Sequence, residues 1–168
     1  MSLTTLIILA IPFALVYLEK KNPFKELFLI PFPKLKPTIY STLKILGLFL
    51  LALIIEGLIF TLLGFKEADK VREVITQQSQ LTLILAVTLA PIGEELLFRS
   101  YFIKRIGVTL SSLLFAGLHL GYGSVTETVA AFTFAMIAGR EFNKNKNIYA
   151  CILSHAAFNA ISLIIFFS

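Results

Sequence analysis

The sequence has few charged residues and a single cysteine. Only 15% of its 168 residues are charged, whereas 57% are hydrophobic and the mean hydropathy is +0.86. A water-soluble domain of this length cannot bury so much apolar side chain, so the composition excludes an ordinary soluble protein and indicates a membrane protein. Because Cys151 has no second cysteine, an intrachain disulfide is excluded, and we expect this side chain to pack in an apolar run.

Internal repeats, low-complexity tracts and a cleavable leader are also absent. Residues 2–18 lack both a basic stretch and an A-x-A pattern, so they are interpreted as a membrane anchor. Candidates for helices that cross about 30 Å of hydrocarbon are residues 2–18, 38–65, 81–103, 108–121, 124–139 and 148–168. So few spans cannot close a membrane β-barrel. The sequence therefore predicts an all-α, polytopic bundle of about six transmembrane helices, with residues 1–168 forming a single domain.

The lysines and arginines gather in alternate loops. Residues 19–37, 104–107 and 140–147 hold Lys20, Lys21, Lys25, Lys34, Lys36, Lys104, Arg105, Arg140, Lys144 and Lys146, whereas the opposite loops hold Lys66, Lys70 and Arg72. An excess of Lys and Arg marks the cytoplasmic side, which predicts that both termini are extracytoplasmic in a multi-pass protein of the cell membrane. The net charge of +5 thus indicates membrane orientation and no nucleic-acid partner. Ala68, Val71 and Ile75 share one face of a predicted interfacial helix over 66–80.

Several polar side chains lie inside the predicted spans. An ionisable group near the bilayer centre costs about 2.5 to 3.5 kcal/mol, so such groups persist mainly where they pair or line a site. Counted from the inner edge at about 1.5 Å per helical residue, Glu94, His119 and His155 all lie roughly 12 to 18 Å deep. The turn at 121–123 is expected to dip below the outer surface. We therefore predict a cavity closed outward and open toward the cytoplasm.

The two adjacent glutamates differ in their expected roles. Glu94 and Glu95 point about 100° apart on a helix, so they cannot share one task. Glu95 and Arg99 have the i, i+4 spacing of a buried ion pair. Glu94 has no such partner on its own helix and is free to act as a general base. Pro91 removes an amide donor three residues earlier, which predicts a kink or an opening beside Glu94.

The positions of the two histidines, taken together, indicate a functional site. A single His among apolar residues is more often a hydrogen-bonded core residue. His155 and Asn159, however, are spaced i, i+4 on one helical face, at the depth of Glu94. Phe115 precedes His119 by one turn and, taken alone, is packing.

Glu56 and residues 126–128 are further polar positions within or near the predicted spans. Glu56, well inside the second span, either pairs with a neighbouring helix or lines the cavity. Thr126, Glu127 and Thr128 begin the fifth span and either face water or simply form an interfacial helix start. The second interpretation is favoured because acids stabilise helix N-termini.

Three motifs then follow in order along the chain. They are E-E-x-x-x-R from Glu94, F-x-x-x-H from Phe115 and H-x-x-x-N from His155. With them the chain resembles the CPBP family of intramembrane proteases, which includes CAAX prenyl proteases of the Rce1 type and bacterial Abi proteins linked to bacteriocin self-immunity. The resemblance covers the expected catalytic core, residues 81–168, whereas residues 1–80 are similar only in being hydrophobic helices.

The resemblance implies proteolysis of membrane-tethered peptides. Glu94 and His119 would activate water, while His155 and Asn159 would stabilise the oxyanion. Glu95 and Arg99 would hold the site in shape, with Phe115 as a supporting residue. The expected partners are the lipid bilayer and a substrate that is lipidated or hydrophobic: a prenylated C-terminus, a leader peptide or a peptide toxin.

Zinc chemistry and two other classes of function stay open at this point. Glu94, His119 and His155 could ligate one zinc ion as a His₂Glu set, although the H-E-x-x-H signature is absent. A small proton-coupled transporter would use the same groups, but no inverted repeat supports it. A membrane scaffold or immunity protein of the same fold would retain the motifs without proteolysis. The sequence leaves the substrate and the oligomeric state undetermined.

Overall fold

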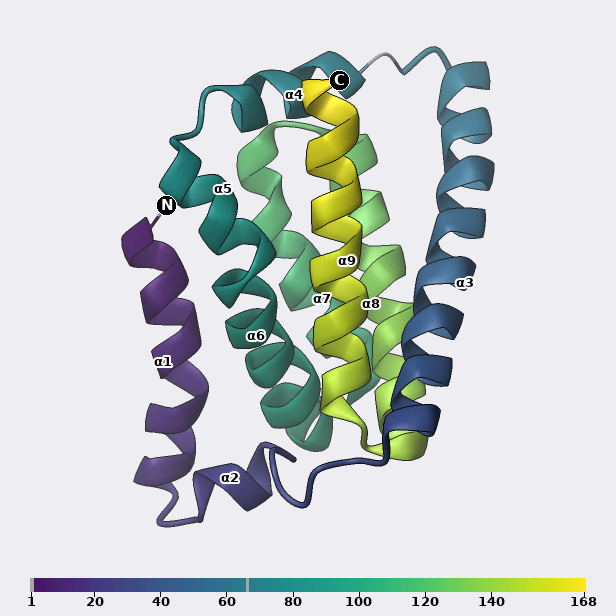
Figure 1. Cartoon of the computed structure of the whole chain (residues 1–168). Helices are drawn as coiled ribbons and strands as arrows, with labels where there is room; N and C mark the ends of the chain where they lie inside the picture. Colours follow the sequence, from purple (N-terminus) through teal and green to yellow (C-terminus); the bar gives the residue numbers. More distant parts are fainter. Residues whose placement is uncertain (1, 66) are drawn as a thin grey trace.

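The computed structural model describes residues 2–65 and 67–168, and every regular element in these ranges is a helix (Figure 1). The prediction for Lys66 lies outside the described residues, as does the side chain of Ala68. The elements are α1 (Ser2–Leu18), α2 (Pro23–Glu26), α3 (Leu35–Leu62), α4 (Ala68–Thr76), α5 (Gln80–Val87), α6 (Leu89–Glu95), η1 (Leu96–Phe102), α7 (Ile103–Leu118), η2 (His119–Tyr122), α8 (Val125–Asn145) and α9 (Ile148–Phe167).

These helices form an up-and-down bundle (Figure 1). The chain crosses it in α1, in α3, in the consecutive segments α5, α6 and η1, and then in α7, α8 and α9. Both termini lie in the half of the molecule that α4 covers, and α2 lies at the opposite end, which we call the basic end because it carries the Lys- and Arg-rich loops. Leu35–Leu62, Leu89–Tyr122 and Ile148–Phe167 are long and apolar enough to cross a membrane. The prediction of a helical membrane bundle is confirmed.

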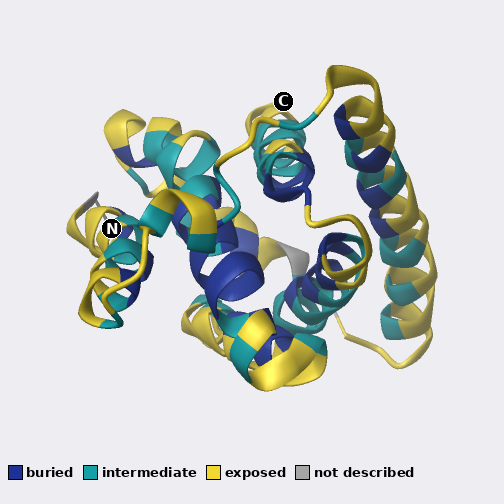
Figure 2. Cartoon of the chain, turned by 90° about the horizontal axis from the view of Figure 1, so that it is seen from below, coloured by how far each residue is buried: buried dark blue, intermediate teal, exposed yellow. Residues whose placement is uncertain are grey.

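Burial agrees with a lipid environment. Helix α3 buries one narrow stripe, Thr38, Ser41, Ile45 and Phe49, and exposes large apolar side chains along the rest of its surface. Viewed from the basic end, the buried residues gather between the helices, while the outer face of α3 is exposed (Figure 2). Apolar side chains that face outward on a helix of this length contact lipid tails at no hydrophobic cost.

The predicted third span is irregular where it carries the site. It breaks at Thr88, whose φ of −104° and ψ of −69° separate α5 from α6, and Pro91 follows in the first turn of α6. The third span is thus kinked, as Pro91 predicted, and the break lies three residues before the proline. After Glu95 the chain continues as the π-helix η1, a wider turn that is often found at functional sites and that the sequence did not predict.

A close helix contact fixes α6 beside the first helix. A Cβ atom at Gly93 would lie 2.8 Å from the backbone of Leu9, so only glycine permits this approach. Gly93 directly precedes Glu94, and α1 therefore supports the segment that carries the first motif.

Candidate active site

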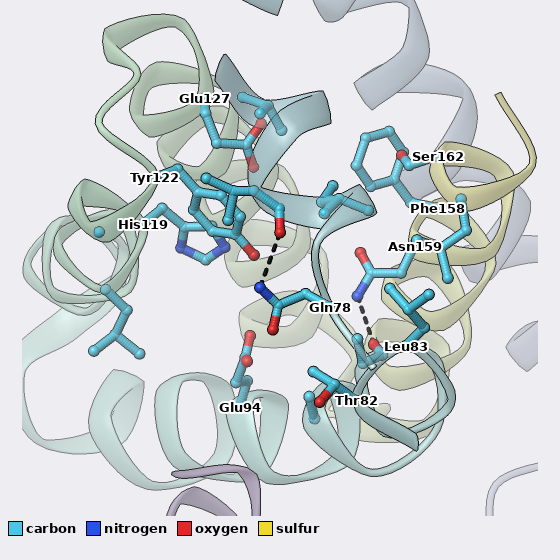
Figure 3. Close-up of a pocket in the computed structure, with 18 of the residues that line it drawn as sticks. Gln78, Thr82, Leu83, Glu94, His119, Tyr122, Glu127, Phe158, Asn159 and Ser162 are labelled. Atoms are coloured by element: carbon cyan, nitrogen blue, oxygen red, sulfur yellow. Dashed lines mark hydrogen bonds between the residues drawn. The ribbon is translucent and has the colours of Figure 1, made fainter. Parts of the chain in front are cut away.

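A cavity of about 600 Å³ lies inside the half of the bundle that α4 covers (Figure 3). Its wall is mainly apolar, as in most small-molecule and peptide sites. The polar side chains that line it are Thr4, Thr5, Gln78, Thr82, Glu94, His119, Tyr122, Glu127, His155, Asn159 and Ser162. All four residues predicted to be catalytic are in this set: α6 provides Glu94, η2 provides His119, and α9 provides His155 and Asn159.

Glu94 and His155 face each other in the cavity. The Oε2 atom of Glu94 lies 3.8 Å from Nε2 of His155, which is a charge contact or a water-bridged distance and too long for a direct hydrogen bond. His155 is the only ion-pair partner of Glu94 among the described residues. A carboxylate in this position has an open oxygen for a water molecule.

His155 is held in place by the second glutamate of the first motif. Its Nδ1 atom lies 2.9 Å from Oε1 of Glu95. An ionised carboxylate only accepts, so Nδ1 carries the proton and Nε2 is directed at the cavity. In the neutral ring Nε2 is then an acceptor. It donates, as the predicted oxyanion role requires, only in the imidazolium form.

The ion pair expected from the i, i+4 spacing of Glu95 and Arg99 is present and completely buried. Nε of Arg99 lies 2.8 Å from Oε2 of Glu95, and the two side chains are 1% and 0% exposed. The alignment is poor for a hydrogen bond, and the guanidinium nitrogens have no hydrogen-bond partner among the described residues. The cation instead lies 4.3 Å from the ring centroid of Phe115 and 5.6 Å from that of Phe134. Phe115 therefore supports the site as a cation–π partner.

His119 is oriented by the backbone. Its Nδ1 atom lies 3.1 Å from the carbonyl oxygen of Phe115, which can only accept, so Nδ1 is the donor and Nε2 is left with a lone pair. The imidazole also stacks on Tyr122, with centroids 5.9 Å apart and an interplanar angle of 21°. The turn that follows ends at Gly123 with a φ of +65°, a conformation that favours glycine.

Asn159 connects α9 to the break in the third span. Its Nδ2 atom donates to the carbonyl oxygen of Ala86 at 2.9 Å (Figure 3). Ala86 lies in the last turn of α5, just before the break at Thr88. One amide N–H of Asn159 is used in this way, and the second N–H remains available to a ligand.

The residues do not form a metal site in this arrangement. Both imidazoles have Nδ1 bonded and Nε2 free, as zinc ligands commonly do. Among the described residues, however, no three His, Cys, Asp or Glu side chains converge closely enough to hold an ion. The donor types suit zinc and their placement does not, so no catalytic step is derived through a metal.

The cavity lies in the half of the bundle away from the basic end. Much of its lining comes from the first turns of α1, from α4, from the start of α8 and from the C-terminal half of α9. Buried side chains such as Phe98 and Phe142 fill the interior nearer the basic end. The expected opening toward the cytoplasm stays a prediction.

Some lining residues were not found from the sequence. Ser162 could have been found, because positions 155, 159 and 162 share one helical face. Gln78 and Tyr122 carried no such signal, and Glu127 was interpreted as a helix start. Of the two roles expected for Glu56, the structure shows pairing with a neighbouring helix. Glu56 accepts a hydrogen bond from the Thr133 hydroxyl of α8 and does not line the cavity.

The fold and the site define a helical membrane protein with glutamate, histidine and asparagine gathered in an internal cavity. Residues 76–161 match the type II CAAX prenyl endopeptidase Rce1-like family, and this segment is about half of the chain and contains all three motifs. The chain belongs to this family, which confirms the resemblance noted from the motifs and implies a protease. No curated protein and no solved structure matches the chain.

Proposed function

We propose that this protein is an intramembrane endopeptidase that hydrolyses membrane-tethered, lipidated or hydrophobic peptides with a water molecule activated by Glu94 and His119. The observation that carries the proposal is the pairing of Glu94 with His155, 3.8 Å apart, in a mainly apolar cavity that His119 and Asn159 also line. His155, His119 and Asn159 are each held by a hydrogen bond to Glu95, to the Phe115 carbonyl and to the Ala86 carbonyl, which is the preorganisation that catalysis requires.

The carboxylate of Glu94 acts as the general base. Water bound between Glu94 and the free Nε2 of His119 gives up a proton to the carboxylate as its oxygen attacks the peptide carbonyl carbon. The carbon–nitrogen bond then breaks, and the same proton passes from Glu94 to the leaving amine. The apolar wall excludes competing water and strengthens these electrostatic interactions.

His155 and Asn159 stabilise the oxyanion. Asn159 supplies its second amide N–H, and His155 donates from Nε2 once its ring is protonated. Glu95 holds the ring of His155 through Nδ1 and lies 2.8 Å from Nε of Arg99. The buried chain Arg99, Glu95, His155 thus orients the group that meets the substrate.

We further propose a multi-pass orientation with the basic loops in the cytoplasm, since the Lys and Arg excess lies at that end. The cavity then receives substrate from the extracytoplasmic half of the bilayer. Secreted leader peptides and peptide toxins reach that side, and prenylated cytoplasmic tails do not. This orientation therefore favours processing or immunity functions over the maturation of prenylated proteins.

The first experiment compares purified wild-type protein with Glu94→Gln and His119→Ala on fluorogenic lipidated peptides. Loss of a general base typically lowers the rate by about 10² to 10⁴, so we expect cleavage to fall by this factor in Glu94→Gln. Glu73→Gln is the matched control, because it removes an exposed carboxylate of α4 outside the cavity. Metal content is measured on the same samples.

Each result has a defined meaning. Cleavage that is lost in both site variants and kept in Glu73→Gln supports the protease. Stoichiometric zinc that disappears with His119→Ala would place the water on a metal. No cleavage by wild type, with binding of a tagged partner unchanged in both variants, would replace catalysis by the scaffold function, and a Glu94-dependent ion flux would indicate a transporter.

A further inference from the structure

One carboxylate of the cavity has no part in the mechanism above. Glu127 lies in the first turn of α8, and its side chain lines the cavity (Figure 3). Within the described part of the chain its carboxylate has no hydrogen-bond or ion-pair partner, although its backbone N–H donates to Ser124. An unpaired carboxylate in an apolar environment is costly and tends to persist where it binds something.

A glutamate in the first turn of a helix usually caps the helix N-terminus, but in α8 Glu67 does this instead of Glu127. Ser124 and Glu127 have the spacing of a capping box, in which the glutamate would bond back to the serine N–H. The described hydrogen bonds contain only the first half, from Glu127 N to Ser124 Oγ at 3.1 Å. Glu67 receives the free amides of the helix start instead, Val125 N at 2.7 Å and Thr126 N at 3.2 Å. Capping therefore does not account for the carboxylate of Glu127.

The charge of the cavity indicates what Glu127 binds. The lining residues include two carboxylates, Glu94 and Glu127, and neither a lysine nor an arginine. Such a cavity attracts a cation and repels a carboxylate, including the free C-terminus of a peptide. Glu94 already faces His155. A cation bound by Glu127 would therefore leave the carboxylate of Glu94 available for catalysis.

The position of Glu127 relates it to the scissile bond. Tyr122 is close enough to both Glu94 and Glu127 to interact electrostatically with each. In the view of Figure 3 Tyr122 lies between the two carboxylates. A group held at Glu127 thus belongs to a peptide residue near the bond attacked at Glu94.

We propose that Glu127 is a specificity-determining residue that binds a cationic side chain, lysine or arginine, of the peptide substrate. The inference rests on the proposed proteolysis and names the substrate class: hydrophobic, membrane-tethered peptides with a positive charge close to the cleavage site. Recognition of a free C-terminal carboxylate is not part of it.

The test uses acylated fluorogenic peptides that differ at one position, which carries lysine, uncharged norleucine or glutamate and is scanned along the sequence around the scissile bond. A charge-assisted contact strengthens binding by roughly tenfold or more, so wild type should cleave the best lysine peptide faster than its norleucine match by this factor. Glu127→Gln should abolish this preference, measured as the ratio of lysine to norleucine cleavage rates within the same variant. Asp69→Asn, an exposed acid of α4 outside the cavity, should keep the preference.

A binding measurement separates the inference from the proposed function. Binding of a dansylated lysine peptide is measured in the Glu94→Gln protein, with and without Glu127→Gln. Weaker binding of the lysine peptide alone supports the inference even if no peptide is cleaved, in which case only the proteolysis fails. Equal cleavage of lysine and norleucine peptides by wild type, or equal binding with and without Glu127→Gln, would overturn the role of Glu127 and leave the protease standing.

Discussion

The basic end of the bundle and the cavity treat charge in opposite ways. At the basic end, acids and bases pair: Glu19 contacts Arg105 and Lys21, and Glu26 lies 2.7 Å from Lys104. In the cavity, Glu94 meets only a histidine and Glu127 has no ion-pair partner among the described residues. The comparison separates charges that hold helices together from charges left open to a ligand.

The boundary between the two regions is the buried pair of Glu95 and Arg99. It belongs to the paired region by its chemistry, yet Glu95 also holds His155, which faces the cavity. One carboxylate therefore connects the packed end to a side chain of the cavity. In the proposed mechanism the two adjacent glutamates have separate tasks, Glu95 to orient His155 and Glu94 to react.

The largest effect we expect concerns the side of the membrane on which each region lies. Lys34→Cys at the basic end and Asp69→Cys on α4 both place a thiol at an exposed position. In intact cells an impermeant maleimide should label Asp69→Cys completely and Lys34→Cys only after permeabilisation. Cys151 is 0% exposed, so it gives no background. The reverse pattern would put the cavity in the cytoplasm and restore prenylated C-termini as the favoured substrates.

The next effect distinguishes a buried pair from a surface pair. Arg99→Met leaves Glu95 without its buried cation, and breaking such a pair costs about 3 to 5 kcal/mol. Lys104→Met removes a partner that is 53% exposed, and surface pairs contribute about 0 to 1 kcal/mol. Denaturant unfolding of the purified protein in detergent should therefore show a large loss for the first variant only. Equal midpoints would mean that the aromatic rings, and not the charge pair, stabilise this region.

Asn159→Ala should lower kcat/KM and leave the fold intact. Removal of one oxyanion donor costs about 10² to 10³ in rate, and the bond from Asn159 to Ala86 is one contact among many between α9 and its neighbours. Leu153→Ala, a lipid-facing change on the same helix, is the control. If the unfolding midpoint of Asn159→Ala fell as far as that of Arg99→Met, Asn159 would be a structural residue of the helix break.

The sequence predicted the parts of the site that depend on spacing within one helix. The pairs Glu95 with Arg99 and His155 with Asn159 follow from i, i+4 geometry, and the common depth of the three motifs follows from counting along straight helices. Contacts between different helices could not be predicted from spacing within one helix. The bond from His155 to Glu95 joins residues 60 positions apart, and no local pattern encodes it.

Two features could not be predicted for a related reason. The π-helical turn at η1 changes which side chains share a face, and hydrophobic periodicity does not resolve one widened turn. The placement of the cavity depends on where α4 packs against the bundle. Depth could be counted from the sequence, whereas the side from which the site is reached is a property of tertiary packing.

The smallest effect concerns those contacts of α4. Glu67 receives hydrogen bonds from Lys70, Thr126 and Val125, which lower its pKa from 4.5 to about 2. Because the folded-state pKa is depressed, its contribution is present above pH 4.5 and is lost as the pH falls toward 2. Glu67→Gln should therefore raise hydrogen exchange of residues 67–76 relative to wild type at neutral pH.

The difference between the two proteins should disappear as the pH approaches 2, where Glu67 of wild type is protonated as well. Glu73→Gln, on the same helix, should exchange like wild type throughout. Hydrogen exchange measured by mass spectrometry at each pH decides this, and the unfolding midpoint at neutral pH should not change. Equal exchange in Glu67→Gln and wild type at neutral pH would contradict this prediction. It would show that apolar contacts of Val71, Val74 and Ile75, and not the hydrogen bonds of Glu67, hold α4 over the cavity.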